Sequence, residues 1–123
     1  MSNLAENLPI YIRIVEGVKE AILSGQIKEG EQLISTTHLS KQYNINIATV
    51  NKGINVLVDE GLVYKKRGIG MFVAEGAVNQ LINERRDTFK DRYIKATLIE
   101  ARRLNFTVEE LQNMVKEVSD ELK

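Results

Sequence analysis

The 123-residue sequence predicts a mostly α-helical protein that carries one small β-hairpin. Three observations lead to this prediction. Apolar residues recur at helical spacing along most of the chain. Capping residues stand at the ends of these stretches, and one short segment has β-prone runs on both sides of a glycine-bearing tip. The hydrophobic content of 43% is ordinary for a globular protein and excludes disorder as the default state.

The first predicted helix lies near the N-terminus. Its apolar positions recur at every fourth residue: Ile10, Ile14, Val18 and Ile22. Pro9 suits the first turn of this helix, and Gly25 suits its C-terminal stop. A connection rich in glycine and charged residues follows over residues 25–32.

Two short helices are predicted next. Ser35 is a typical N-cap residue and starts a helix that ends near Tyr43. Asn44 and Asn46 mark a tight turn, and Asn46 also caps the second helix, which stops at Gly61. The residues expected to be buried on this second helix are Val50, Ile54, Leu57 and Val58. Two short helices joined by a turn of about four residues form a helix-turn-helix.

A β-hairpin is predicted directly after the second helix. Residues 62–66 and 71–73 are β-prone and flank the basic tip Arg67-Gly68-Ile69-Gly70. A hairpin in this position is a wing. Residues 1–75 are therefore predicted to form a winged helix-turn-helix domain.

Residues 76–123 are predicted to form a short helical tail. A helical pattern runs over about 77–104 and is interrupted by Asn105, and Thr107 with Glu110 forms a capping box that starts the last helix. Two helices are too few to enclose a core of their own, so we expect their apolar faces to pack against a second copy of the chain. The candidate dimerisation residues are Leu81, Phe89, Tyr93, Leu111, Val115 and Val118.

The distribution of charge is more informative than the net charge of zero. Residues 36–74 hold five basic and two acidic side chains, which gives this third of the chain a local charge of +3. Residues 75–123 hold nine basic and ten acidic side chains. The only positive bias therefore falls on the predicted helix-turn-helix and wing, where a nucleic acid would bind.

The exposed face of the second helix carries the first candidate DNA contacts. The face opposite the apolar positions carries Ala48, Asn51, Lys52 and Asn55. Asparagine and lysine match the donors and acceptors that base edges present in a major groove. Asn46 and Thr49, at the helix start, can donate to phosphate or to a base edge. The alternative is that this polar face is simply solvated, which the basic wing beside it argues against.

The wing carries the second set of candidate contacts. Lys65, Lys66 and Arg67 are three adjacent cations, and Gly68 and Gly70 leave the backbone thin beside them. A cation next to backbone that has no side chains can enter a narrow minor groove. The glycines also suit the turn itself.

These residues resemble a known family. The pattern Pro9-Ile10-Tyr11, Leu33-x-Ser35, Thr49-Val50, Glu60-Gly61-Leu62 and Gly68-x-Gly70-x-Phe72-Val73 resembles the DNA-binding domain of the GntR family, and the short tail resembles its YtrA-type subfamily. The resemblance implies DNA contacts at Ser35, Thr36, Thr37, Asn46, Ile47, Ala48, Thr49, Asn51, Arg67 and Gly68.

The sequence also departs from the family pattern. The broader family usually has Pro at the position of Ile34 and Arg at that of Thr37, and often Arg at the positions of Ile47 and Asn51. The missing arginines remove phosphate and guanine contacts, so the operator sequence of better-known relatives does not transfer to this chain.

We therefore expect a cytoplasmic, dimeric repressor that binds double-stranded operator DNA. The subfamily resemblance implies control of an adjacent ABC-transporter operon. The sequence does not reveal an effector, which could bind at the dimer interface or between the tail and the DNA-binding domain. The alternative is a winged-helix module that binds protein and not DNA. One histidine, no cysteine and no phosphate loop argue against an enzyme, a metal site or a bound cofactor, and no apolar run predicts a membrane span.

Overall fold

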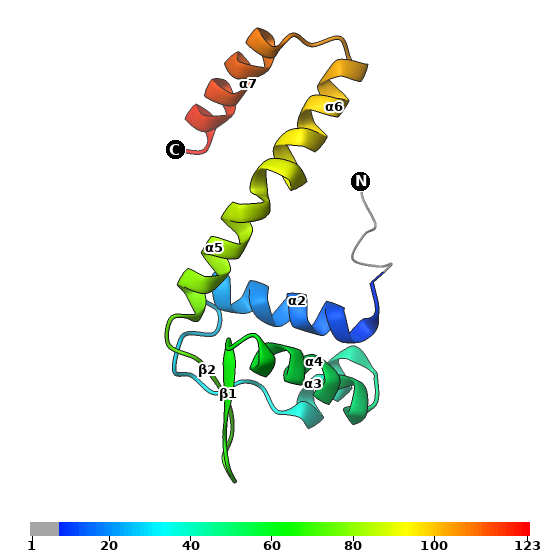
Figure 1. Ribbon diagram of the computed structural model, residues 1–123, viewed down its shortest axis with the longest axis vertical. Coiled ribbons are helices and arrows are strands. Elements are labelled where there is room, and N and C mark those ends of the chain that lie inside the picture. The colour runs from blue at the N-terminus through cyan, green and yellow to red at the C-terminus, as the bar shows by residue number, and fades with distance from the viewer. Residues whose placement is uncertain (1–7) are drawn as a thin grey trace. The chain divides into compact units, whose positions relative to one another are not determined.

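The computed structural model describes residues 8–123, and it confirms the predicted fold class (Figure 1). Two compact units make up the chain: a winged unit that ends at Asn83 and a tail unit, Glu84–Lys123. The elements run in the order α2 (Ile10–Leu23), α3 (Thr36–Tyr43), α4 (Ile47–Asp59), β1 (Val63–Lys66), β2 (Gly70–Val73), α5 (Ala77–Phe89), the π-helical segment η1 (Lys90–Ile94), α6 (Lys95–Arg103) and α7 (Val108–Glu121).

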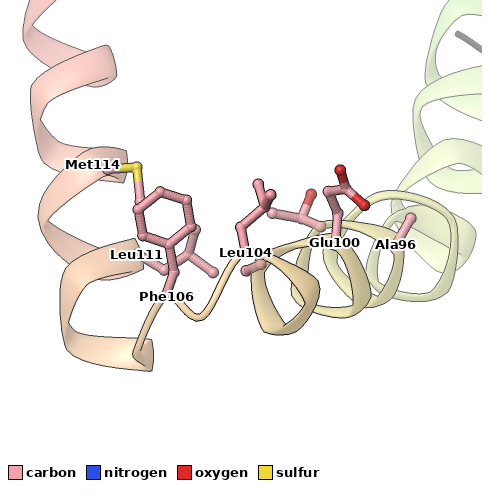
Figure 2. A pocket seen from close by; sticks show the side chains of 8 residues that line it. Ala96, Glu100, Leu104, Phe106, Leu111 and Met114 are labelled. Atoms are coloured by element: carbon pink, nitrogen blue, oxygen red, sulfur yellow. The ribbon is translucent and has the colours of Figure 1, made fainter.

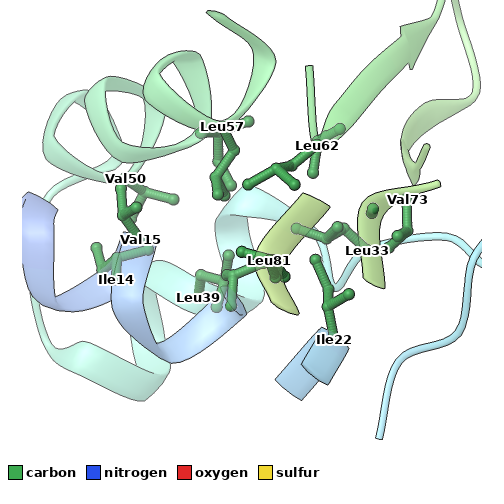
Figure 3. Packing of buried hydrophobic residues seen from close by; sticks show 14 residues of the cluster. Ile14, Val15, Ile22, Leu33, Leu39, Val50, Leu57, Leu62, Val73 and Leu81 are labelled. Atoms are coloured by element: carbon green, nitrogen blue, oxygen red, sulfur yellow. The ribbon is translucent and has the colours of Figure 1, made fainter. Parts of the chain in front are cut away.

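The core of the winged unit forms where α2 packs against α4 (Figure 3). Ile14, Val50 and Leu57 are fully buried there, as their helical spacing predicts. Gly53 lies at the crossing, and a Cβ atom at this position would come 3.0 Å from the backbone oxygen of Tyr11. The glycine therefore lets the two helices approach closely.

One predicted core position is wrong. Val58, expected to be buried on α4, is 37% exposed. Val58 directly follows the buried Leu57, and a step of about 100° along a helix turns it toward the solvent side.

The predicted caps of the helix-turn-helix are confirmed. Ser35 Oγ accepts a hydrogen bond from the backbone N–H of His38 at 3.1 Å, and Asn46 Oδ1 accepts one from that of Thr49 at 2.9 Å. Asn44 closes α3 in the left-handed conformation, with φ of 53°. These local bonds satisfy backbone groups at the helix ends.

The wing is an antiparallel pair of strands in which Lys66 pairs with Gly70, so the turn consists of residues 67–69. The connection after α2 runs along the outer edge of β2 and forms backbone hydrogen bonds with it. The backbone N–H of Gly30 donates to Val73, and that of Leu33 donates to Met71. The wing is therefore held along β2 by a segment that is distant in the sequence.

The start of α5 belongs to the winged unit. Ala77 and Leu81 are 1% and 2% exposed and lie in its core. The assignment of Leu81 to dimerisation is therefore wrong, because this side chain has no free surface for a partner. Glu29 adds a capping contact here, since its carboxylate accepts hydrogen bonds from the backbone N–H groups of Gly76 at 2.9 Å and Val78 at 3.0 Å.

The tail unit is helical throughout, as predicted. Helical structure runs through α5, η1 and α6 to a break at Asn105, whose φ is 62°. Thr107 and Glu110 form the predicted capping box at the start of α7. Of residues 84–123, all of which the structure describes, only Ala101 is buried.

Candidate nucleic-acid interface

A groove between α4 and the wing brings together residues that are far apart in the sequence. It has a volume of about 580 Å³, and the N-terminal end of α3 closes it. Its polar lining comes from Gln32, Ser35, Thr36, Asn51, Asn55 and Lys65, and its apolar lining from Leu33, Ile34, Ile54, Val58, Ile69 and Met71, with Gly70. Five of the predicted contact residues line this groove: Ser35, Thr36, Asn51, Lys65 and Gly70.

The other predicted contact residues lie outside the groove lining. They are Thr37, Asn46, Ile47, Ala48, Thr49, Lys52, Lys66, Arg67 and Gly68, and apart from the half-buried Thr49 they are exposed. Ile47 and Ala48 occupy the first turn of α4. Arg67 and Gly68 stand at the turn of the hairpin.

The three adjacent cations of the wing do not form one cluster. Side chains alternate along a strand, so neighbouring lysines project to opposite faces of the hairpin. Lys65 lines the groove, whereas Lys66 Nζ lies 4.4 Å from the centroid of the Phe72 ring on the other face. Tyr64 stacks on the same Phe72 ring at 5.9 Å. Only Lys65 is therefore positioned beside α4.

The two polar residues on the face of α4 also differ. Asn51 lines the groove, but Lys52 Nζ lies 4.2 Å from the centroid of the Tyr11 ring on α2. A cation–π contact of this kind restrains an exposed lysine. Lys52 therefore presents its charge beside the N-terminal end of α2 and away from the wing.

The start of α4 has few free side-chain donors. Asn46 Oδ1 accepts from both the backbone N–H and the Oγ1 hydroxyl of Thr49, each at 2.9 Å. The hydroxyl proton of Thr49 is thus already used, and only the Nδ2 amide of Asn46 is left to donate. Backbone N–H groups at this helix start remain suitable for a phosphate oxygen.

Asn55, predicted on the same exposed helix face as Asn51, also lines the groove, as the helical spacing of four residues indicates. Two groove residues were missed as contacts in the sequence: Gln32 and Ile69. Gln32 has no such signal, because its Nε2 atom donates to the backbone oxygen of Ile69, 37 positions away, at 3.1 Å. Ile69 reads as a simple turn residue between two glycines.

A second hollow lies within the tail unit, in the bend between α6 and α7 (Figure 2). It has a volume of about 400 Å³ and is lined by Ala96, Thr97, Glu100, Ala101, Leu104, Phe106, Leu111 and Met114. Its lining is mostly apolar, and the carboxylate of Glu100 lies 3.6 Å from Arg103 Nη1. The hollow shares Leu111 and Met114 with another apolar hollow along α7.

The residues described give no sign of metal or membrane chemistry. Within residues 8–123, no group of three or more His, Asp or Glu side chains is placed to hold a metal ion. None of the helices in this range is long and apolar enough to cross a bilayer.

Comparison with known proteins places the groove in a family context. Residues 10–73 match the model for bacterial regulatory proteins of the gntR family. The chain is 31% identical to the HTH-type transcriptional repressor YtrA of Bacillus subtilis over 94% of this chain and 88% of that protein. It is 32% identical to the repressor NagR of Bacillus subtilis, over 65% of this chain and 33% of that protein.

Solved structures give the same result. A putative transcriptional regulator of the GntR family from Bacteroides thetaiotaomicron matches with a TM-score of 0.69 at 28% identity, over 94% of this chain and all of that one. The DNA-binding domain of AraR in complex with operator ORR3 matches with a TM-score of 0.53 at 33% identity, over 55% of this chain and 81% of that one.

Proposed function

The chain belongs to the gntR family of bacterial regulatory proteins and is YtrA-like within it, and we propose that it represses transcription as a homodimer bound to operator DNA. Like its relatives, it is a DNA-binding transcription regulator and not an enzyme. The dimer, the repression and the identity of the contact residues are the proposed parts.

The groove between α4 and the wing carries this proposal. A major groove of about 12 Å width admits a helix, and in this docking the exposed face of α4 meets base edges while the wing reaches the adjacent minor groove. Asn51 and Asn55 supply amides that match adenine. Lys65 supplies a cation on the wing side of the protein groove between α4 and the wing, where it neutralises a DNA phosphate.

The apolar surface of the tail supports the proposed homodimer. Phe89, Tyr93, Val115 and Val118 are 48–64% exposed, and Leu111 on α7 is half-buried. A large exposed apolar patch on a protein surface marks an interaction site. We propose that residues 1–75 bind DNA and that residues 76–123 hold two chains together, in the cytoplasm, where operator DNA lies.

The regulated genes are proposed from the resemblance alone. The resemblance to YtrA-type regulators implies control of an adjacent ABC-transporter operon. The relative YtrA of Bacillus subtilis is named a repressor. A dimer bound over a promoter would occlude RNA polymerase. The alternative, a winged helix that binds only protein, is disfavoured by the AraR domain, whose similar fold is in complex with operator DNA.

Substitution of Asn51 tests whether α4 reads bases. Asn51→Ala should relax preference at one position of each half-site, by about 1–3 kcal/mol of discrimination, while leaving affinity for unrelated DNA nearly unchanged. Competition binding with single-base operator variants measures this, and Asn113→Ala, an exposed asparagine on α7, is the matched control. Equal weakening on all variants would show that Asn51 only positions the protein.

A further inference from the structure

The tip of the wing presents an apolar side chain among cations. Ile69 is 63% exposed, and it stands between Gly68 and Gly70 and two positions after Arg67. Single exposed apolar residues are common on protein surfaces and by themselves indicate nothing. Ile69 differs because its backbone is fixed from both sides.

Two hydrogen bonds fix the backbone of Ile69. Its N–H donates to the backbone oxygen of Lys66 at 3.0 Å, which closes the turn. Its backbone oxygen accepts from Gln32 Nε2 at 3.1 Å, which links the turn to the connection between α2 and α3.

Gly70 makes room for this contact. Its φ is 147°, and a Cβ atom at this position would come 2.5 Å from Gln32 Nε2. Any side chain at position 70 would therefore displace the amide that holds Ile69. The glycine serves the position of the tip as well as the turn.

We propose that Ile69 is a specificity-determining residue that reads the minor groove, and that Gln32 is the residue that positions it. This inference rests on the proposed function, in which the wing enters the minor groove. A G·C pair places the N2 amino donor of guanine on the groove floor, whereas an A·T pair does not. An apolar side chain against the floor leaves that donor without a hydrogen-bond partner, which is unfavourable. Ile69 therefore selects A·T pairs at the steps that the wing covers.

The first experiment uses inosine and the full-length protein on an operator that it selects from random duplexes. An inosine·C pair lacks the N2 amino group but keeps the major-groove edge of a G·C pair. At the wing-facing steps we expect affinity to fall about tenfold when A·T is replaced by G·C, and to return with inosine·C. Equal affinity for G·C and inosine·C would overturn the proposal.

A matched pair of variants separates the floor contact from groove width, since removal of the N2 group also changes the groove's shape. Ile69→Val and Ile69→Thr give side chains of nearly equal shape, but only the threonine hydroxyl can accept from guanine N2. Ile69→Val should keep the preference for A·T over G·C. Ile69→Thr should bring the ratio of the two affinities close to one. The same preference in both variants would overturn the floor contact.

The role of Gln32 is tested by the same ratio. Gln32→Met keeps the length of the side chain and removes its donor, so we expect the preference for A·T over G·C at the wing-facing steps to fall. The thermal unfolding midpoint should stay near that of the unchanged protein. Lys65→Ala is the control, because loss of a cation should weaken both operators equally. An unchanged ratio in Gln32→Met would overturn its positioning role.

Failure of this inference differs from failure of the proposed function. A protein that selects no DNA sequence at all would contradict the function itself. A protein that selects an operator but gives the same affinity for A·T, G·C and inosine·C at the wing-facing steps would contradict only the role of Ile69.

Discussion

The winged unit and the tail unit bury very different shares of their apolar residues. In the winged unit, apolar side chains from α2, α4 and β2 are almost completely excluded from solvent (Figure 3). In the tail unit only Ala101 is, although α7 carries apolar residues at regular helical spacing. Burial of apolar surface is the main favourable term in folding, so the winged unit can be stable from its own contacts and the tail unit needs others.

The exposed surfaces of the two units differ as well. The winged unit presents amides and a lysine along a groove, and this surface suits a polyanion with base edges. The tail unit presents Phe89, Tyr93, Ile99 and Val115, which are 48–64% exposed. We therefore propose that a single chain carries one surface for DNA and one for another copy of itself, and substitutions in each should change different properties.

The largest effect is expected from charges on the apolar stripe of α7. Val115→Asp together with Val118→Asp should give a monomer at micromolar concentration, because two carboxylates would have to be desolvated at the interface. DNA affinity should fall by about 100-fold or more, since the second half-site would no longer bind intramolecularly. Sedimentation and gel-shift titration measure the two changes.

The control places the same charges elsewhere on α7. Gln112 and Asn113 are exposed polar residues outside the apolar stripe, and their joint replacement by aspartate should leave both assembly and DNA affinity close to normal. If the unchanged chain sedimented as a monomer, the tail would not be a dimerisation unit.

A smaller effect is expected within the winged unit. Counterion release gives a slope of about −0.9 in log affinity against log salt for each phosphate contact. Lys65→Ala should make this slope less steep by about 1.8 for a dimer, because Lys65 faces the groove in both subunits. Lys66→Ala should change it less, since that ammonium group lies over Phe72 on the other face. A larger change with Lys66→Ala would mean that the opposite face of the wing meets the DNA.

The smallest effect is expected at the start of α5, within the winged unit. Hydrogen bonds from the backbone N–H groups of Gly76 and then Val78 lower the pKa of Glu29 below its usual 4.5. Because the folded-state pKa is depressed, this stabilisation is present above about pH 4.5 and is lost as the pH falls through the folded value. Glu29→Gln should lower the thermal midpoint slightly at pH 7, and the difference should vanish in acid. A difference that persisted in acid would assign the effect to another cause.

Local signals in the sequence predict most of the winged unit and the start of α7 in the tail unit. The caps at Ser35, Asn46 and Thr107 were predictable because each rests on hydrogen bonds between residues three positions apart. Gln32 was not, because its partner comes near only when the connection after α2 packs along β2. Contacts of this range depend on the whole fold.

Strand geometry explains another difference from the sequence analysis. Three adjacent cations read as one patch, yet alternation along β1 separates Lys65 from Lys66. Leu81 was misassigned for a related reason. It continues the apolar pattern of the tail, but the core of the winged unit extends into α5 and encloses it.

Selection of binding sites from random duplexes by the full-length protein tests the central claim most directly. If each chain reads half of a site and the tails join two chains, the selected sequences should contain two inverted half-sites, about one helical turn or 34–36 Å apart. The positions facing α4 should be the most constrained, and the flanking wing-facing steps should be rich in A·T. A single half-site without a mirrored copy, or no enriched sequence, would contradict the account.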